Sequence, residues 1–194
     1  MLAWGLQSAT VMSEMTRTAH ALHVYQDDTT LSTTVAAFLA PAFAEGHAAI
    51  SIGTRPHIAA IEQRLRTDGH DVDGARSRGQ YLTLDAENAV ALLLRDGLPT
   101  QETFDRVVGE HVARLSARHG EVRAFGEIVN LLWRDGKRAA ALRLEELWNG
   151  ALGRHPLALV CGYSSRVIQD TPGTGSLETI GAVHDHVLPA PGKV

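Results

Sequence analysis

The stretch 121–163 constrains the possible folds of this chain more than any other part. It begins with a short apolar run that ends at Phe125, after which apolar residues recur at helical spacing until Asp135 and Gly136 supply a C-terminal stop signal. A second helix, expected over 140–151, carries its apolar residues on one face. Such a face is buried by packing against a sheet, so the two helices are expected to cover one.

The end of this stretch completes a strand–helix–helix–strand unit. Pro156 ends the helical region, and residues 157–161 form a continuous apolar run, typical of a strand buried on both faces of a parallel sheet. Residues 22–25, 48–54 and 80–84 are further strand candidates, each followed by a helical pattern. Strands that alternate with helices predict a single α/β domain, a three-layer sandwich around a mostly parallel central sheet.

Shorter signals complete the expected map of the chain. We expect helices over 86–94 and 177–183, one long helix over 100–115, and a loop at 168–175. Residues 1–18 are interpreted as a loose N-terminal extension and residues 190–194 as a disordered tail. The folded domain is therefore expected to span residues 19–189.

Composition argues against several classes of function. The 194 residues carry a formal net charge of -4, and Lys and Arg are scattered without a run that could follow phosphates, so direct nucleic-acid binding is not expected. The single cysteine cannot form an internal disulfide, which fits a cytoplasmic location. No segment reaches the roughly 18 apolar residues of a membrane span.

The central stretch also resembles a known family. The motifs RAFGEIVNLLW, LRLEELWN and LVCGY, in this order, are similar to the signature of the MEDS family, the sensory domain of methanogens, methylotrophs and the dichloromethane-dehalogenase repressor. The segments HALHVYQDD, GQYLTLDAENAV and VHDHVLP extend the similarity over residues 19–189. Because the family is a divergent relative of KaiC and RecA-type ATPases, the resemblance implies a RecA/KaiC-like fold.

The resemblance also implies a function. It suggests a sensory, regulatory module that binds a small molecule, proposed for the family to be a hydrocarbon derivative, and passes its state to a regulator or kinase. Family members are often fused to a DNA-binding helix-turn-helix or a histidine kinase, and neither is evident in these 194 residues. Signalling through a separate protein partner is therefore expected, and a homodimer is a further expectation.

The turn 26–30 does not suit a nucleotide. In RecA-like folds, the first strand-to-helix turn holds a phosphate loop, in which glycines expose backbone N–H groups and a lysine contacts the terminal phosphates. This turn has no glycine and no lysine, and its carboxylates would repel a triphosphate. We expect no ATP binding, and we expect Asp28 or Thr29 to cap the following helix.

Polar and aromatic residues stand at the predicted carboxyl ends of the strands, the edge where open parallel sheets bind ligands. We expect a pocket with a mostly apolar wall for a small, largely apolar molecule, whose polar group Glu127 would hold. The alternative for Asp28, Thr54 and Asp85 is helix capping, and for Glu127 a favourable charge in a first helical turn. The candidate ligand-binding residues are Tyr25, Asp28, Thr54, Asp85, Phe125, Glu127 and Tyr163.

An enzyme is the alternative class of function. The sequence contains no GxSxG, HExxH or GxGxxG motif and no cysteine–histidine pair at a known catalytic spacing. Composition and periodicity therefore assign no catalytic residue. A small-molecule enzyme or a degenerate nucleotide hydrolase that uses Glu127 and Asp85 remains the rival of the sensory module.

No cofactor is predicted, but the chain contains residues that could hold zinc or haem iron if the fold gathered two to four of them. His23 and Cys161 would approach each other if their strands were neighbours, and the segment around His184 could instead cover the sheet edge. The candidate ligands are His20, His23, Cys161, His184 and His186.

Two tryptophans of the family pattern are expected to differ in role. Trp148 lies on the apolar face of its helix and is interpreted as a core anchor. Trp133 is followed by the charged residues Arg134 and Asp135, so we expect it to be partly exposed and part of a partner surface.

Overall fold

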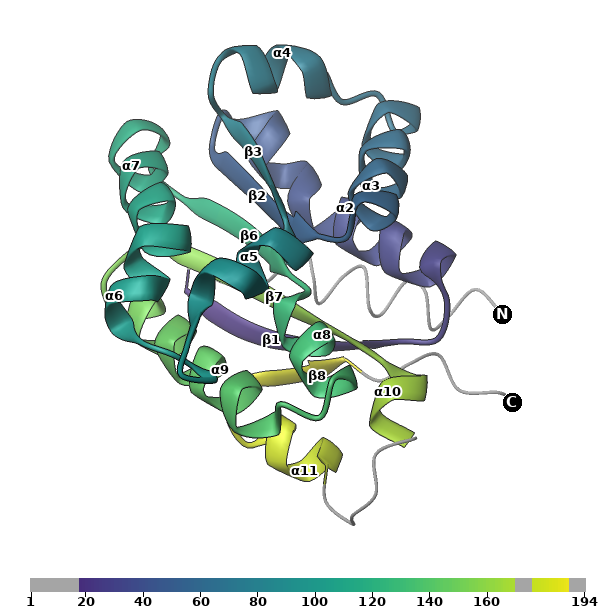
Figure 1. The fold of residues 1–194 in the computed structure, drawn as a ribbon. Coiled ribbons are helices and arrows are strands. Elements are labelled where there is room, and N and C mark those ends of the chain that lie inside the picture. Colours follow the sequence, from purple (N-terminus) through teal and green to yellow (C-terminus); the bar gives the residue numbers. More distant parts are fainter. Residues whose placement is uncertain (1–17, 170–175, 189–194) are drawn as a thin grey trace.

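A six-stranded parallel sheet forms the centre of the molecule (Figure 1). The computed structural model describes residues 18–169 and 176–188. The strand order is β3-β2-β6-β7-β1-β8, and all neighbouring strands run parallel. The strands are β1 (Ala19–Tyr25), β2 (Ala48–Gly53), β3 (Tyr81–Asp85), β6 (Val122–Gly126), β7 (Leu157–Ser164) and β8 (His186–Leu188). The predicted α/β domain with a parallel sheet is confirmed.

Helices cover both faces of this sheet and complete the three layers (Figure 1). One face is covered by α2 (Asp28–Glu45), α3 (Arg55–Thr67) and α4 (Val72–Ser77). The opposite face carries α5 (Ala86–Leu93), α6 (Gln101–Phe104), the π-helix η1 (Asp105–Gly109), α7 (Glu110–His119), α8 (Ile128–Arg134) and α9 (Arg138–Leu152). The remaining elements are the two-stranded sheet of β4 (Leu94–Arg95) and β5 (Leu98–Pro99), and helices α10 (Ser165–Gln169) and α11 (Ser176–Gly181).

The sheet divides the apolar interior into two clusters of buried side chains. Strand β1 is buried along its whole length, and its side chains alternate between the two faces. Leu22 and Val24 pack with α8 and α9, whereas Ala21 and Tyr25 lie on the side of α2. This double burial explains why the central strands are nearly continuous apolar runs in the sequence.

Trp148 is a core residue, as expected. Its side chain is 1% exposed and packs edge-on against the ring of Phe104, with 5.2 Å between ring centroids. The expectation that Trp133 is partly exposed is wrong, because this side chain is 3% exposed. It turns inward against Tyr163, and the guanidinium of Arg138 lies over its ring.

Several expected elements differ in detail. The helix expected over 100–115 contains a π-helical turn between α6 and α7. Asp27, not Asp28 or Thr29, caps α2, because its carboxylate accepts a hydrogen bond of 2.7 Å from the Thr30 amide. Ile168 and Gln169, expected to begin a loop, belong to helix α10.

Some expectations lie outside the described residues. These are the structure of residues 1–17 of the N-terminal extension, of 170–175 and of the tail 190–194. Among the described residues, no helix has the length and hydropathy that a membrane span requires.

Candidate functional site

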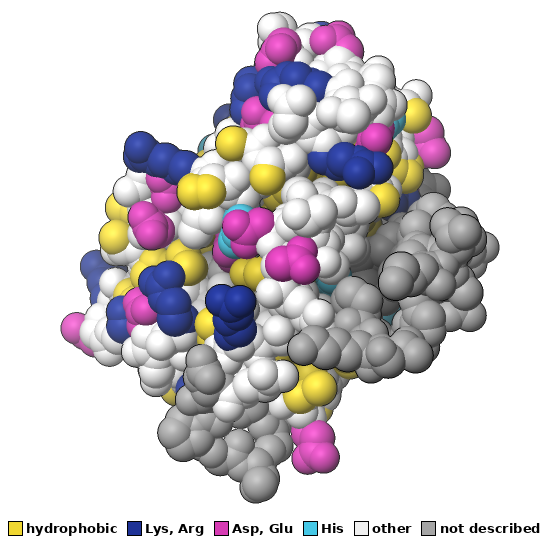
Figure 2. All heavy atoms as spheres, turned by 90° about the vertical axis from the view of Figure 1, so that its right-hand side faces the viewer, with side chains coloured by type: hydrophobic (Ala, Val, Ile, Leu, Met, Phe, Trp, Pro, Cys, Tyr) yellow, Lys and Arg dark blue, Asp and Glu magenta, His cyan; other side chains and the backbone are white. Residues whose placement is uncertain are grey.

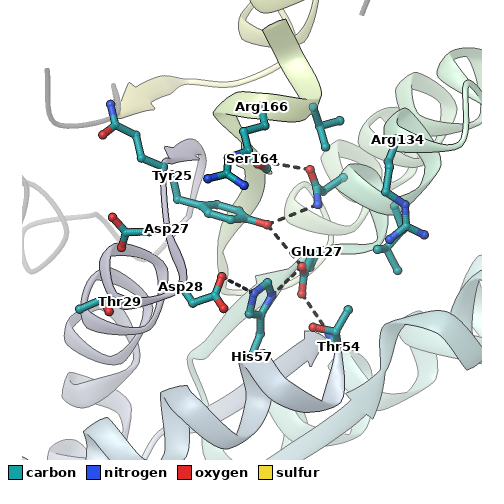
Figure 3. A pocket seen from close by; sticks show the side chains of 14 residues that line it. Tyr25, Asp27, Asp28, Thr29, Thr54, His57, Glu127, Arg134, Ser164 and Arg166 are labelled. Atoms are coloured by element: carbon teal, nitrogen blue, oxygen red, sulfur yellow. Dashed lines mark hydrogen bonds and ion pairs between the residues drawn. The ribbon is translucent and has the colours of Figure 1, made fainter. Parts of the chain in front are cut away.

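A pocket of about 570 Å³ lies at the carboxyl ends of the central strands (Figure 3). The strand register brings these ends together, because Tyr25 of β1 lies beside Ser164 of β7, and Ile52 of β2 beside Gly126 of β6. The pocket is lined by Tyr25, Gln26, Asp27, Asp28, Thr29, Thr54, His57, Glu127, Asn130, Leu131, Arg134, Ser164, Arg166 and Val167. Four of the seven candidate ligand-binding residues are therefore gathered here, namely Tyr25, Asp28, Thr54 and Glu127.

Glu127 is the buried centre of this pocket. Its side chain is 1% exposed, and both carboxylate oxygens accept hydrogen bonds. One oxygen accepts from the Nδ1 of His57 at 2.7 Å and from the Tyr25 hydroxyl at 3.4 Å, and the other accepts from the Thr54 amide at 3.0 Å. These donors hold the buried carboxylate in one orientation.

A glycine on the neighbouring strand makes room for this carboxylate. A β-carbon at Gly53 would lie 3.2 Å from the nearest Glu127 oxygen and 3.4 Å from the Phe125 ring. That is tighter than ordinary contact, so a side chain here would displace Glu127. Gly53 therefore lets β2 and the Glu127 carboxylate approach closely.

His57 links buried Glu127 to the pocket mouth. It occupies the first turn of α3, its Nδ1 faces Glu127, and its Nε2 lies 3.2 Å from the exposed carboxylate of Asp28 (Figure 3). Both ring nitrogens thus face carboxylate oxygens, an arrangement that suits the doubly protonated imidazolium. The hydrogen bond to Glu127, reinforced by its charge and by Asp28, raises the pKa of His57 above its ordinary value despite partial burial.

A second set of hydrogen bonds joins β1, α8 and β7. The amide nitrogen of Asn130 donates to the Tyr25 hydroxyl at 3.3 Å, and its carbonyl oxygen accepts from the Ser164 backbone at 2.9 Å. Burial, together with the charge and hydrogen bond of Glu127, raises the pKa of Tyr25 far above its ordinary value, so its hydroxyl remains a donor to Glu127. The base of the pocket is therefore a preorganised polar network.

The other three candidate residues do not line this pocket. Asp85 caps α5 through the amides of Glu87 and Asn88 and pairs with Arg55. Phe125 is buried under α2, and Tyr163 donates a hydrogen bond of 2.9 Å to Glu145 on the opposite side of the sheet. The expected combination of aromatic rings around Glu127 is therefore not formed. Tyr163 pairs in register with Val24 and not with Tyr25, so its side chain lies on the opposite face of the sheet. Phe125 shares the face of Tyr25 but is enclosed by the core under α2.

The pocket wall is more polar than the sequence suggested. Leu131, Val167 and the ring of Tyr25 supply the apolar surface, and most other lining side chains are polar or charged. Figure 2 shows the face of the molecule onto which the strand ends open, and acidic and basic side chains are interspersed over its described part. A strictly apolar ligand would leave most of these groups without partners.

Sequence reasoning missed His57, Asn130, Arg134 and Arg166. A search confined to strand ends omits His57, which lies one helical turn beyond β2, and Asn130, which lies one turn beyond β6. Asn130 could nevertheless have been found from the sequence, because a polar residue within the apolar run Ile128–Trp133 indicates a buried polar contact. Polar residues in the first helical turn after a strand can therefore line the same pocket as residues at the strand end.

The metal-ligand candidates fall into two groups. His20, Cys161 and His184 come together around Glu145, a residue that sequence reasoning did not include. His186 is exposed on β8, which pairs with β1, so this segment covers the sheet edge, the alternative to metal binding.

The expected approach of His23 to Cys161 is wrong, although β1 and β7 are neighbours. His23 lies on the sheet face of Ala21 and Tyr25, the face opposite to that of His20. Neither of its ring nitrogens has a hydrogen-bond partner among the described residues. Burial lowers the pKa of His23 to about 4.

Comparison with known proteins first defines the class of fold. The chain is similar to the crystal structure of a KaiC-like protein from the hyperthermophilic archaeon Pyrococcus horikoshii OT3, with a TM-score of 0.55 and 13% sequence identity, over 87% of this chain and 70% of that chain. At this identity, the similarity shows the fold alone. The fold is therefore KaiC-like, as the RecA/KaiC-like prediction required.

The family follows from the sequence. The model of the MEDS family, the methanogen/methylotroph, DcmR sensory domain, matches residues 19–180. The chain belongs to the MEDS family of sensory domains, which supports a sensory or regulatory role. No match was found among curated proteins.

Proposed function

We propose that this protein is a sensory module that binds a small hydrocarbon derivative in the pocket around Glu127 and His57. Membership of a sensory domain family supports a ligand-binding role. The observation that carries the proposal is the chain of contacts from buried Glu127 through His57 to Asp28 at the pocket mouth. Charged side chains held in fixed positions offer directional hydrogen bonds and ion pairs to a small molecule.

The charges of the pocket suggest which polar group the ligand carries. The acidic side chains are already engaged, since Asp27 caps α2 and Asp28 contacts His57. Two arginines also line the pocket. Arg134 contacts Asp135, but Arg166 has no ion pair with any residue that the structure describes. A carboxylate or similar anion on the ligand would pair with Arg166. The proposed ligand is thus a small acid with a short apolar body, which is more polar than the sequence alone suggested.

In this arrangement Glu127 is a positioning residue. Its oxygens are occupied by three donors, so it holds His57, Tyr25 and the start of α3 instead of contacting the ligand alone. His57 is the group that meets the ligand, because it lies between Glu127 and the open mouth of the pocket. Binding of an anion beside His57 would replace its contact with Asp28 and alter the first turns of α2 and α3.

We assign the output of this change to a protein partner, a regulator or a kinase, or to a second copy of the chain. The α2 and α3 helices cover one face of the sheet and contact each other closely, so a shift of their first turns would alter that face. Size-exclusion chromatography with light scattering, with and without a binding compound, measures whether ligand changes self-association.

The rival enzymatic function has less support. Asp85, which would act with Glu127, lies outside the pocket and is held by Arg55 and the α5 amides. The His57–Glu127 pair alone has the geometry of a general base with its orienting carboxylate. The two ring nitrogens of His57 face Glu127 and Asp28, and no hydrogen bond joins them to the lining hydroxyls of Thr29, Thr54 or Ser164, so we favour binding over catalysis.

A thermal-shift screen tests the proposed function. The compounds are short-chain carboxylic acids with the matching alcohols, amines and alkanes. We expect acids to raise the melting temperature of the wild type, and the shift to be lost in Arg166→Ala and His57→Gln. Arg143→Ala, which removes an exposed arginine of α9 paired with Glu146, serves as the matched control. Equal stabilisation of Arg166→Ala and the wild type by the same acids would contradict the proposal.

A further inference from the structure

Four metal-ligating side chains meet in the interior, apart from the pocket described above. They are His20 of β1, Glu145 of α9, Cys161 of β7 and His184, which lies between α11 and β8. Each contributes one ligand atom, and these four atoms lie within 4.8 Å of one another. We propose that they bind one divalent transition-metal ion, zinc. This site does not depend on the proposed ligand pocket.

The distances between the ligand atoms fit tetrahedral coordination. His20 Nε2 lies 3.3 Å from Cys161 Sγ and 3.3 Å from a Glu145 oxygen, and that oxygen lies 3.2 Å from the sulfur. The Nε2 of His184 lies 3.4 Å from the other oxygen of Glu145. Zinc bonds of about 2.0 to 2.3 Å arranged as a tetrahedron place neighbouring ligand atoms about 3.3 to 3.8 Å apart. His20, Cys161 and one Glu145 oxygen are thus already near tetrahedral spacing, and His184, within 4.8 Å of them, would complete the tetrahedron by closing on the ion.

The orientation of His20 is fixed by a chain of hydrogen bonds outside the cluster. The carbonyl of Val183 can only accept, so the side-chain nitrogen of Asn149 donates to it, at 3.0 Å. The side-chain oxygen of Asn149 then accepts from His20 Nδ1 at 2.8 Å. His20 thus carries a proton on Nδ1, and in the neutral ring Nε2 presents a lone pair to the cluster. Metal-binding histidines are oriented in this way.

A hydrogen bond from its Nδ1 also fixes the orientation of His184. Its Nδ1 lies 2.7 Å from the carbonyl oxygen of Ile180 and must donate to it. Its Nε2 is buried and has no hydrogen-bond partner among the described residues, although it faces Glu145. In the neutral ring, this atom is an acceptor turned toward another acceptor. A cation at the centre of the cluster would bind both His184 and Glu145.

The ligand set selects the kind of ion. Two imidazole nitrogens, one sulfur and one carboxylate oxygen are the donors that zinc accepts, whereas magnesium and calcium prefer oxygen alone. The Glu145 side chain is completely buried, and the Tyr163 hydroxyl donates to it at 2.9 Å. Haem iron uses four coordination positions for the porphyrin nitrogens, so four protein ligands suit a single ion instead of haem. With four protein ligands it resembles a structural site, which keeps no position for a substrate.

The position of the site indicates its role. Two hydrogen bonds of 2.8 Å attach the segment 176–188 to β1, because the Asp185 amide donates to the His20 carbonyl and the His20 amide donates to the Asp185 carboxylate. Asn149 attaches the same segment to α9. His184 would add a metal bond between this segment and the sheet. Zinc would therefore strengthen the attachment of α11 and β8 to the edge of the sheet.

A cobalt titration tests this proposal. The full-length protein is stripped with a chelator, and Co²⁺ is added as a spectroscopic substitute for zinc. We expect one Co²⁺ per chain, intense visible bands of tetrahedral coordination, a thiolate-to-cobalt charge-transfer band in the near ultraviolet, and displacement by Zn²⁺. Because the chain contains one cysteine, a thiolate band identifies Cys161 without any variant.

Variants provide the second measurement. Cys161→Ser is expected to lose the charge-transfer band, and His184→Ala to weaken Co²⁺ binding by at least about tenfold. His186→Ala is the matched control, since it removes an exposed histidine of the same segment. If a variant does not fold, the wild-type spectrum alone decides. Absence of stoichiometric binding, a spectrum without the thiolate band, or equal effects of His184→Ala and His186→Ala would overturn the proposal.

Discussion

At the scale of single residues, the Glu127 carboxylate determines the properties of the pocket. Both of its oxygens accept hydrogen bonds from groups that can only donate, namely a backbone amide and a protonated imidazole nitrogen. Replacement of Glu127 with Gln turns one acceptor into a donor that faces another donor. We expect Glu127→Gln to destabilise the unliganded protein by about 1 to 3 kcal/mol, measured by urea denaturation. Unchanged stability would show that Glu127 is not held as the structure indicates.

The His57 side chain gives the pocket a defined pH dependence. Its pKa is raised in the folded state, so its contribution to stability is fully present below the ordinary histidine pKa and is lost as the pH rises through the folded-state pKa. We expect the difference in unfolding free energy between the wild type and His57→Gln to shrink over that interval. Urea denaturation from about pH 5 upward measures it, because carboxyl groups with ordinary pKa values stay ionised there.

The other histidines titrate in both proteins, so their contributions cancel in this difference. Glu127→Gln provides the second comparison, because it removes the largest cause of the raised pKa. In that variant an NMR titration should place the His57 pKa lower than in the wild type. A pH-independent difference between the wild type and His57→Gln would contradict the assigned contact.

Gly162 is required for close packing between β7 and its neighbours. A β-carbon at this position would lie 2.9 Å from the Phe125 ring and 3.6 Å from Leu31. We expect Gly162→Ala to lower stability by about 1 to 3 kcal/mol through overpacking. Gly126→Ala is the matched control, since its β-carbon would meet only Leu159, at 3.9 Å. Thermal melts of the two variants should differ, and equal melting temperatures would contradict this packing.

At the residue scale, the sequence predicted which residues lie at the strand ends but not the direction in which each side chain points. Tyr25, Thr54 and Glu127 lie together in one pocket because carboxyl ends of parallel strands share an edge, and their role in ligand binding stays a prediction. Tyr163 does not line the pocket because a shift of one residue along a strand reverses the direction of a side chain, and Phe125 does not because it is enclosed by the core under α2. His57 was missed because its role depends on Glu127, a residue far away in the sequence.

At the scale of elements, the unit from β6 to β7 was the most predictable part of the chain. Its helices α8 and α9 occur where apolar periodicity and the Asp135–Gly136 stop indicated. The short strand β8 was not predicted as a strand, because three residues carry no periodic signal and the strand exists through its pairing with β1. The π-helical turn η1 was also not predicted, since it changes hydrogen bonding but not the pattern of apolar residues.

Helix α9 contributes the largest completely buried anchor of the core. Trp148 packs edge-on against Phe104 and is 1% exposed. We expect Trp148→Ala to destabilise the fold by about 3 to 5 kcal/mol, because it leaves a large cavity. Leu92→Ala, at a side chain that is 59% exposed, provides the control and should have little effect. Denaturation curves that coincide for Trp148→Ala and the wild type would contradict a core role.

At the scale of the whole molecule, a KaiC-like fold is combined with a first strand-to-helix turn that lacks the residues for phosphate binding. Asp27 and Asp28 occupy this turn at the mouth of the pocket. Their charges repel phosphate, so we expect no ATP binding in the micromolar range, which would require about 8 kcal/mol. Calorimetric titration with ATP and Mg²⁺ measures this, and a micromolar dissociation constant would contradict the expectation.

The central claim is that the pocket around His57 holds a small molecule. Native mass spectrometry of the protein purified from its own host tests it most directly. We expect the wild type to carry one non-covalently bound small molecule per chain, released by denaturation. It should be lost in His57→Ala and kept in His111→Ala, which removes a histidine outside this pocket. A wild-type chain without such a molecule, or equal occupancy in the wild type and His57→Ala, would contradict the claim.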